Sequence, residues 1–374
     1  MRNPGCFLLA LLVILFLAVT GCTDTDDHAS APATAAAPKT GSGVGGGSAS
    51  PTDVQVAAFD AVVPAAYLQM PALGETFVDF SIHNPTGSSR TYTIESEIPG
   101  YTEKAVNTVT IPAGASETVG QTPTLKNSAI PREMTPASFR YRIALSDGTL
   151  VEEQTLPVSI YAKDTMIWAV SEGEETTELT PYIGAWVTPH ATGIDTLIRD
   201  AAEYHPGKGI TGYQCGAQCT DEQWEEDTNS QVKAIFESLK NDYKIVYINS
   251  PFAYGKTNEN VQRVRLPADS LTSKSANCID GTVLYASALE SIGMNPRIIV
   301  LPEHAFLCYD TKPDDPSHFA CLETTMTSSA TFEEALKAGE EAYQDEMQKG
   351  RFTSGESNDL SVAQLRTEGI RPMV

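Results

Sequence analysis

The sequence predicts a multi-domain protein in which an all-β sandwich is followed by an α+β domain. Its 374 residues are enough for two domains of ordinary size. Between residues 53 and 165, apolar residues alternate with polar ones, as they do on strands that turn one face to a core. After residue 180, apolar residues recur at i, i+3, i+4 and i+7, which is typical of helices. An acidic stretch that begins at Ser171 separates the two patterns.

The chain is strongly acidic, with 25 Lys and Arg against 48 Asp and Glu and a formal net charge of −23. Contacts with phosphates need compensating cations, so this balance argues against nucleic acid or an anionic lipid surface as the main partner. Hydrophobic residues make up 41% of the chain, which is enough to form buried cores and excludes disorder of the whole chain.

The first residues are typical of a lipoprotein signal peptide, predicted over residues 1–21. Arg2 supplies a basic region, and the apolar run at 7–19 is shorter than a membrane span. The letters VTGC that end at Cys22 resemble the lipobox of prokaryotic lipoproteins, which implies cleavage before Cys22 and lipidation of this residue. The alternative is an ordinary cleavable signal with a chance cysteine. We expect a lipid-anchored protein of the cell membrane that faces away from the cytoplasm, in the periplasm or at the cell surface.

Residues 22–52 are mostly Ala, Pro, Thr, Gly and Ser and are expected to form a flexible tether. The sandwich is predicted over 53–165, where short alternating runs are separated by turn signals such as HNPTGSS and LSDGT. It resembles the immunoglobulin-like sandwiches of exported proteins, although it has no cysteine for an inter-sheet disulfide. No residue in it suggests catalysis, and we interpret it as a spacer or docking module. The residues expected on its buried faces are Val78, Phe80, Ile82, Tyr92, Ile94, Phe139, Tyr141, Ile143 and Leu145.

The α+β domain is predicted over residues 180–350, and residues 351–374 are interpreted as a C-terminal extension. Three apolar runs, RIIVLP, HAFLCYD and FACLETTM, are expected to be consecutive antiparallel strands. Helices are expected where apolar residues follow the helical period; Gly293 is suited to end one of them, and Thr331 is suited to cap another. The helical segments begin at Ile194, Val232, Cys278 and Phe332.

A thiol, an imidazole and a carboxylate follow one another through this domain. Cys278 lies at a predicted helix start behind Ser275 and Asn277, either of which can cap the helix. Unpaired backbone N–H groups and the positive end of the helix dipole favour a thiolate there, as a cysteine nucleophile requires. His304 is the candidate base that accepts and returns the proton, and Glu323 is the candidate carboxylate that orients the imidazole.

The register of the expected strands supports this grouping. His304, Phe306 and Cys308 share one strand face, because residues two apart point the same way. Cys321 and Glu323 share a face of the next strand. If the two cysteines lie opposite each other, His304 is diagonal to Glu323. That diagonal is about 7–8 Å between backbones, which a glutamate side chain can bridge to a ring nitrogen.

The order and spacing of these motifs resemble the transglutaminase-like superfamily of papain-type thiol enzymes. The likeness covers roughly residues 183–326 and includes NCID at the helix start, GMNPR after the helix, HAF at the base and LETTM at the carboxylate. It implies that Cys278 is the nucleophile, His304 the general base and Glu323 the third member of a triad. Thr325 matches the threonine of the last motif. Members of this superfamily cross-link proteins, cleave peptides, deglycosylate, or have lost activity.

Other interpretations compete with these assignments. Asp280 matches the acid of the superfamily's C-x-D motif, but any acid in a first helical turn is stabilised by the dipole. Gln262 lies before the nucleophile helix and is either a hydrogen-bond donor to an oxyanion or a surface residue. For Cys278 the alternative is a buried, inert cysteine, and for Glu323 it is a solvated strand residue. His318, in a polar loop, is the competing base.

The cysteines outside the signal peptide complete the pattern. Cys215 and Cys219 form a C-x3-C, which indicates either a local disulfide or a metal site with an unusual zinc spacing. Cys308 and Cys321 are a second candidate disulfide of an oxidising compartment. Cys278 is then left unpaired, as a nucleophile would be. We expect no metal and no cofactor.

These observations lead to two functional hypotheses. The first is a membrane-anchored extracytoplasmic thiol enzyme that hydrolyses amides or transfers acyl groups on protein or peptide substrates of the cell envelope. The second is a transglutaminase-like binding or envelope-scaffold lipoprotein whose site is catalytically idle. Either protein would bind the membrane through its N-terminal lipid, and neither is expected to bind nucleic acid.

Overall fold

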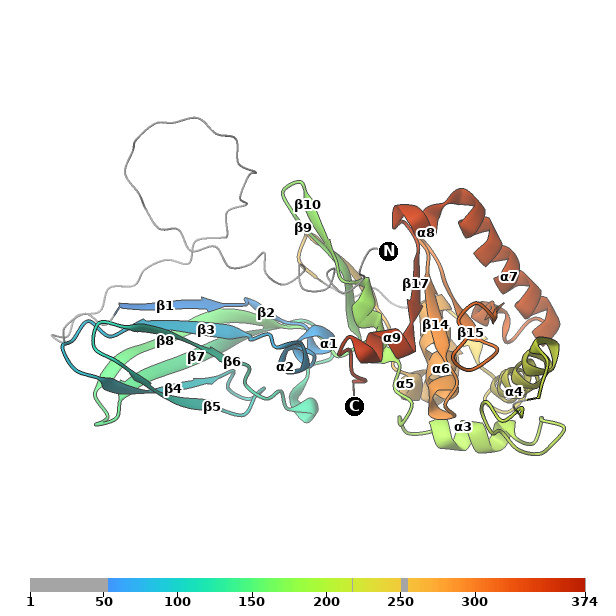
Figure 1. The fold of residues 1–374 in the computed structure, drawn as a ribbon, viewed down its shortest axis with the longest axis horizontal. Coiled ribbons are helices and arrows are strands. Elements are labelled where there is room, and N and C mark those ends of the chain that lie inside the picture. The colour runs from blue at the N-terminus through green and yellow to red at the C-terminus, as the bar shows by residue number, and fades with distance from the viewer. Residues whose placement is uncertain (1–52, 217, 250–254, 374) are drawn as a thin grey trace. The chain divides into compact units, whose positions relative to one another are not determined.

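The computed structural model describes residues 53–216, 218–249 and 255–373, which fall into two compact units (Figure 1). Unit 1 contains the described part of Met1–Asp60 together with Glu75–Thr124 and Ala137–Val158. Unit 2 contains Ala61–Gly74, Leu125–Pro136 and Ser159–Val374. The structure is mixed α and β, as expected of a multi-domain α+β protein. The predicted signal peptide, Cys22 and the tether lie outside the described residues.

Unit 1 is built from strands in two sheets (Figure 1). One is antiparallel with the order β1-β3-β6. The other has the order β8-β7-β4-β5. The strands are β1 (Asp53–Ala58), β3 (Val78–His83), β4 (Arg90–Glu97), β5 (Ala105–Ile111), β6 (Ser116–Gln121), β7 (Thr135–Leu145) and β8 (Leu150–Ile160).

Aromatic rings join the two sheets of unit 1. Phe80 of β3 lies against Tyr141 of β7 with ring centroids 5.3 Å apart, and Phe77 lies against Phe139 at 5.4 Å. Both pairs meet edge to face, the arrangement that ring quadrupoles favour. The predicted alternation is confirmed for the residues listed above with one exception, Leu145, which is half-buried at the end of β7. The alternating pattern therefore identified the residues of this core.

Unit 2 contains most of the helices. They are α1 (Pro64–Tyr67), α2 (Met70–Leu73), α3 (Ile194–Ala201), α4 (Asp221–Asn241), α5 (Pro267–Ser273), α6 (Cys278–Ser291), α7 (Phe332–Lys349), α8 (Arg351–Ser354) and α9 (Val362–Thr367). Its 3-10 helices include η3 (Thr180–Trp186) and η4 (Thr324–Met326). None of the helices in the described ranges has the length and apolar character of a membrane span.

The main sheet of unit 2 is antiparallel with the order β16-β15-β14-β17. Its strands are β14 (Pro296–Val300), β15 (Ala305–Asp310), β16 (Phe319–Leu322) and β17 (Asn358–Ser361). The three consecutive antiparallel strands predicted from the sequence are thereby confirmed. Smaller pairings involve β2 (Ala61–Val62), β9 (Thr165–Glu172), β10 (Glu175–Glu178), β11 (Val246–Tyr247), β12 (Glu259–Arg263) and β13 (Ser275–Ala276).

Both faces of the main sheet are buried. Ile298 and Leu307 belong to the large core that also holds the apolar residues of α6. Their chain neighbours Ile299 and Phe306 point the other way and pack with Tyr343 of α7. Successive strand residues face opposite sides, so a sheet covered on both sides needs apolar residues at nearly every position. This is why these strands are continuous apolar runs in the sequence.

Helix α7 lies directly on β16. The predicted N-cap is confirmed, because the Thr331 side chain accepts a hydrogen bond from the backbone N–H of Glu334 and the Glu334 carboxylate accepts one from the N–H of Thr331. A Cβ at Gly339 would lie 2.6 Å from the backbone carbonyl of Cys321, too close for any other residue without movement of the backbone. The absence of a side chain at Gly339 thus lets α7 sit on the strand that leads to Glu323.

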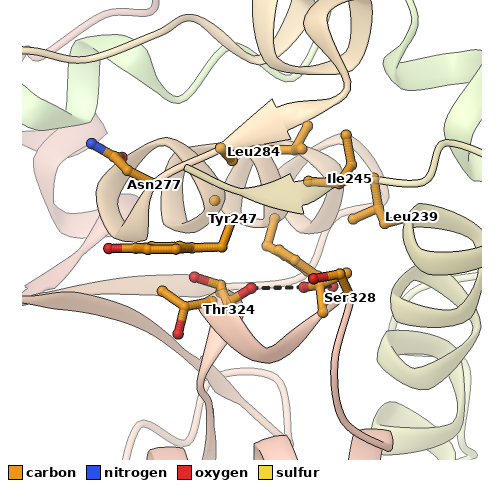
Figure 2. Close-up of a pocket in the computed structure, with 12 residues that line it drawn as sticks. Leu239, Ile245, Tyr247, Asn277, Leu284, Thr324 and Ser328 are labelled. Carbon is orange, nitrogen blue, oxygen red and sulfur yellow. Dashed lines mark hydrogen bonds between the residues drawn. The ribbon is translucent and has the colours of Figure 1, made fainter. Parts of the chain in front are cut away.

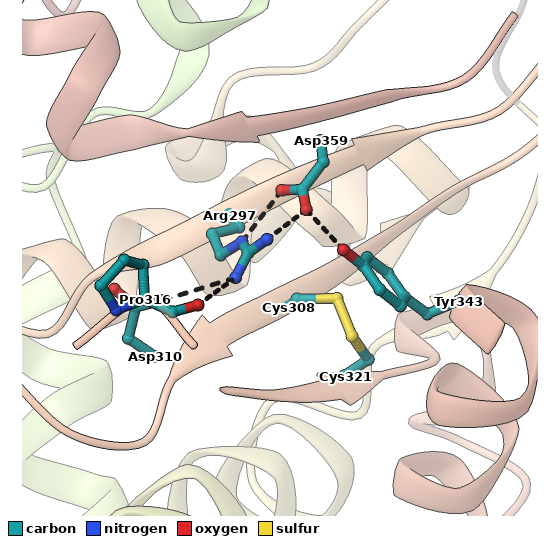
Figure 3. The surroundings of a disulfide bond; sticks show 7 residues. All are labelled: Arg297, Cys308, Asp310, Pro316, Cys321, Tyr343 and Asp359. Carbon is teal, nitrogen blue, oxygen red and sulfur yellow. Dashed lines mark hydrogen bonds and ion pairs between the residues drawn. A yellow bond between two sulfur atoms is a disulfide. The ribbon is translucent and has the colours of Figure 1, made fainter. Parts of the chain in front are cut away.

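Residues 351–374 are part of unit 2, although their sequence suggested an extension outside the domain. Strand β17 pairs antiparallel with β14 and lies at the edge of the main sheet. Asp359 of β17 forms an ion pair with Arg297 of β14 and accepts a hydrogen bond of 2.9 Å from the Tyr343 hydroxyl (Figure 3). Val362 of α9 is buried in the core. All four residues of β17 are only half-buried, so this strand has no apolar alternation that would have predicted it.

Candidate active site

The nucleophile candidate occupies the first position of α6. Asn277 is the N-cap, because its side chain accepts a hydrogen bond of 2.8 Å from the N–H of Asp280. The Asp280 carboxylate in turn accepts one of 3.3 Å from the N–H of Asn277, which completes a capping box. Of the two cap candidates, the helix thus uses Asn277 rather than Ser275. Cys278 is half-buried at the positive end of the helix dipole, as predicted.

Asp280 holds the start of α6 against the preceding chain. Its side chain is fully buried, and Oδ1 accepts a hydrogen bond of 2.7 Å from the backbone N–H of Arg265. The guanidinium of Arg265 lies 4.0 Å from Oδ2. Both carboxylate oxygens therefore have structural partners. Asp280 thus fixes the start of the helix that carries Cys278.

The imidazole and the carboxylate candidates lie together. His304 Nε2 is 2.6 Å from Glu323 Oε2, a short, charge-assisted hydrogen bond. The other carboxylate oxygen accepts hydrogen bonds from the backbone N–H of Thr325 at 3.0 Å and from its hydroxyl at 2.6 Å. Glu323 is therefore fixed from two sides, with its side chain 12% exposed, while the imidazole keeps 35% of its side chain accessible.

The predicted strand register is confirmed, and one local expectation was wrong. Cys308 pairs with Cys321 across β15 and β16. His304 immediately precedes β15, as expected for a residue at a strand start. Glu323, however, lies just past the end of β16 and is the N-cap of η4. The strand ends there because Glu323 turns its carboxylate back to the N–H of Thr325, a local hydrogen bond that competes with strand pairing.

Cys278 interacts with the same imidazole. Its side chain contributes to the raised pKa of His304, whose Nε2 is held by Glu323. The hydrogen bonds to Cys278 and to Glu323 outweigh burial and raise the pKa of His304 to about 10. Burial alone would raise the pKa of Glu323, but hydrogen bonds and charge from His304, with those from Thr325, lower it overall. At neutral pH the site is therefore a carboxylate beside an imidazolium.

Protein-family models and curated proteins contain no match to this chain. The resemblance to the transglutaminase-like superfamily thus stays a prediction that rests on the motifs and their order. The contact between His304 and Glu323 is independent of that resemblance, since it comes from the geometry, and Cys278 is near enough to act on the same imidazole. Chemically, a thiol hydrogen-bonded to an imidazole, which a carboxylate orients, is the arrangement that activates a cysteine nucleophile.

The other four cysteines of the described residues form two disulfides. Cys215 is bonded to Cys219 with Cα atoms 6.1 Å apart, so the zinc interpretation of the C-x3-C is wrong. Cys308 is bonded to Cys321 within the main sheet (Figure 3). In the described part of the chain, Cys278 is the free cysteine, and no cluster of His, Cys, Asp and Glu suits a metal ion. Two disulfides are consistent with an extracytoplasmic location.

Two further candidates have partners of their own. The carboxamide oxygen of Gln262 accepts a hydrogen bond of 3.0 Å from the indole Nε1 of Trp168 on the neighbouring strand β9. His318, the competing base, is held by Asp315 at 2.9 Å and lies 3.4 Å from Asp221. The histidine that contacts Cys278 is His304.

Tyr247 is a residue at this site that the sequence analysis missed. A small cavity of about 10 Å³ lies beside the start of α6, with Tyr247, Asn277, Gly281 and Thr324 among its lining residues (Figure 2). Apolar side chains, including Leu284, also line it. Tyr247 belongs to a short strand, and only the pairing of that strand with β13 brings it to the nucleophile helix. No motif in the sequence marks it.

Proposed function

We propose that the protein is a membrane-anchored extracytoplasmic thiol enzyme that hydrolyses amides or transfers acyl groups on protein or peptide substrates. The observation that carries this proposal is that Cys278, at the start of α6, acts on the His304 imidazole, which is hydrogen-bonded to Glu323. A merely buried cysteine would need neither an imidazolium nor a fixed carboxylate beside it. The partly exposed imidazole gives a substrate access to the group.

The first half of the reaction forms a thioester. The Cys278 thiolate attacks the carbonyl carbon of the amide, so a C–S bond forms while the carbonyl electron pair moves onto oxygen. When this pair returns, the C–N bond breaks and the departing amine takes the proton of the His304 imidazolium. Glu323 keeps the ring oriented and stabilises its charged form, without itself becoming protonated. The acyl group is then bound to sulfur.

The second half releases the acyl group. Water or a second amine attacks the thioester carbonyl, His304 takes the proton of the attacking group, and the thiolate leaves. Water gives hydrolysis, and an amine gives acyl transfer. The two outcomes share the same three residues, so the triad geometry is compatible with both.

The finer architecture belongs to the same proposal. Unit 2 would be a transglutaminase-like domain of papain type, which the order of the motifs from NCID to LETTM supports. Unit 1 would be an immunoglobulin-like spacer or docking module. Lipid on Cys22 would anchor the chain through residues 22–52, as the lipobox-like VTGC supports. The substrate would then be a protein or peptide of the cell envelope, and a net charge of −23 argues against nucleic acid.

Comparison of the wild type with Cys278→Ala tests this function. Envelope peptides incubated with the wild type are expected to show new cleaved or cross-linked species by mass spectrometry, and the variant is expected to produce none. The substitution removes one half-buried sulfur and leaves both disulfides in place, so it isolates the chemistry from the fold. Identical peptides from both proteins would contradict the enzyme and favour the catalytically idle scaffold.

A further inference from the structure

Strand pairing brings Tyr247 beside the start of the nucleophile helix. Strands β11 and β13 are parallel, and Tyr247 pairs with Ala276, two residues before Cys278. Backbone hydrogen bonds on either side fix this register. The N–H of Val246 donates to the carbonyl of Lys274 at 3.1 Å, and the N–H of Ile248 donates to the carbonyl of Ala276 at 3.0 Å. The ring position of Tyr247 is therefore tied to the chain that enters α6.

The ring of Tyr247 lies beside residues that adjoin the reactive groups. It lies over the small cavity, between Asn277 and Thr324 (Figure 2). Asn277 directly precedes Cys278 and Thr324 directly follows Glu323. Tyr247 is 47% exposed, so a substrate can reach it. In the structure, the hydroxyl donates a hydrogen bond of 3.0 Å to the side chain of Asn249, which is exposed.

The proposed thioester step needs a donor at the carbonyl oxygen. Negative charge builds up on that oxygen as the C–S bond forms, and a fixed donor at this position is usually a large contributor to acyl transfer. Gln262 was the donor suggested by the sequence, and its carboxamide oxygen accepts a hydrogen bond from Trp168 on β9, while Tyr247 is the donor that lines the cavity beside the start of α6. Tyr247 has an O–H donor, a fixed backbone and a place beside the nucleophile helix.

We propose that the Tyr247 hydroxyl donates a hydrogen bond to the carbonyl oxygen that becomes negative when Cys278 attacks. The inference rests on the proposed function and adds a residue to it. The O–H turns from Asn249 to the oxyanion, and the phenol keeps its proton throughout. No bond other than those of the thioester step forms or breaks.

The electrostatics of the site keep this donor protonated. Burial, followed by the negative charges of Cys278 and Glu323, raises the pKa of Tyr247 above its ordinary value. The phenol is thus neutral in the pH range where His304 is an imidazolium. A neutral O–H can donate to an oxyanion, whereas a phenolate could not.

Two reactions of Cys278, acylation and alkylation, distinguish a donor to the oxyanion from a residue that acts on the thiolate. Attack on p-nitrophenyl acetate builds an oxyanion, whereas displacement of iodide from iodoacetamide builds none. Tyr247→Phe keeps the ring and removes the hydroxyl. We expect it to slow the p-nitrophenol burst by about 10²-fold, the usual effect of losing one oxyanion donor, and to leave the iodoacetamide rate unchanged.

Tyr204→Phe is the matched control, because Tyr204 is a similarly exposed phenol of unit 2, at 38%, whose hydroxyl binds Asp242. It should change neither rate. If Tyr247→Phe slows both reactions equally, the hydroxyl acts on the thiolate and the inference is wrong. Unchanged acylation in Tyr247→Phe also overturns it. If the wild type itself gives no burst, the proposed function fails and the inference fails with it.

Discussion

Replacing His304 by alanine is expected to slow acylation of Cys278 by p-nitrophenyl acetate by about 10³-fold, within the range that a general acid–base group contributes. Two effects combine. The group that exchanges protons with the substrate is lost, and so is its interaction with Cys278. The measurement is the rate of the first-turnover burst of p-nitrophenol near neutral pH, with the full chain.

His318→Ala is the matched control for this prediction. His318 lies in the same unit and is also hydrogen-bonded to a carboxylate, that of Asp315, yet it is not the histidine at Cys278. Its replacement should leave the burst rate unchanged. An equal loss in both variants, or no loss in His304→Ala, would mean that His304 does not act on the thiol.

Replacing Glu323 by glutamine is expected to lower the pKa of His304 from about 10 by roughly one to three units, the usual effect of removing one opposite charge. The direction follows from the charges, because a neutral amide no longer stabilises the imidazolium. In the wild type, His304 stays protonated as the pH rises toward 10, whereas in the variant it loses its proton at lower pH. The pKa is measured from the NMR chemical shifts of the His304 ring across a pH titration.

The raised pKa of His304 in the wild type also predicts how the stability of the fold changes with pH. The folded-state pKa of His304 lies above its unfolded value of about 6.5, so protonation stabilises the fold fully below that pH. This stabilisation is lost as the pH rises through about 10, and Glu323→Gln should lose it earlier. Glu303→Gln is the control, since Glu303 is an exposed acid next to His304. If Glu303→Gln and Glu323→Gln changed the pH at which stability is lost by the same amount, the cause would be a general charge effect. It would then not be the 2.6 Å contact between His304 and Glu323.

Local signals explain what the sequence could predict. The Asn277 cap acts within one helical turn, and the alternation around Phe80 acts within one strand. Once Cys308 is taken to lie opposite Cys321, parity places His304 diagonal to Glu323, because residues two apart on a strand share a face.

Strand β17 and the position of Tyr247, which the sequence did not predict, depend on contacts between distant parts of the chain. Strand β17 is held by the ion pair between Asp359 and Arg297, which are 62 residues apart, and its own residues show no alternation. Tyr247 reaches the site only because β11 pairs with β13. Glu323 ends its strand by accepting a hydrogen bond from the N–H of Thr325. The periodicity of apolar residues does not distinguish this local hydrogen bond from continued strand pairing. The first two of these depend on which segments meet in space, whereas the third is local.

Alkylation of Cys278 by iodoacetamide at about pH 6 is the most direct test of the central claim, that His304 holds a reactive thiolate. At this pH, free cysteine is almost entirely protonated, because its pKa is about 8.5. We expect the full chain to take up one carbamidomethyl group at Cys278 at least about tenfold faster than free cysteine does, and His304→Ala to remove this advantage. Labelling at the rate of free cysteine, unchanged in His304→Ala, would contradict the claim.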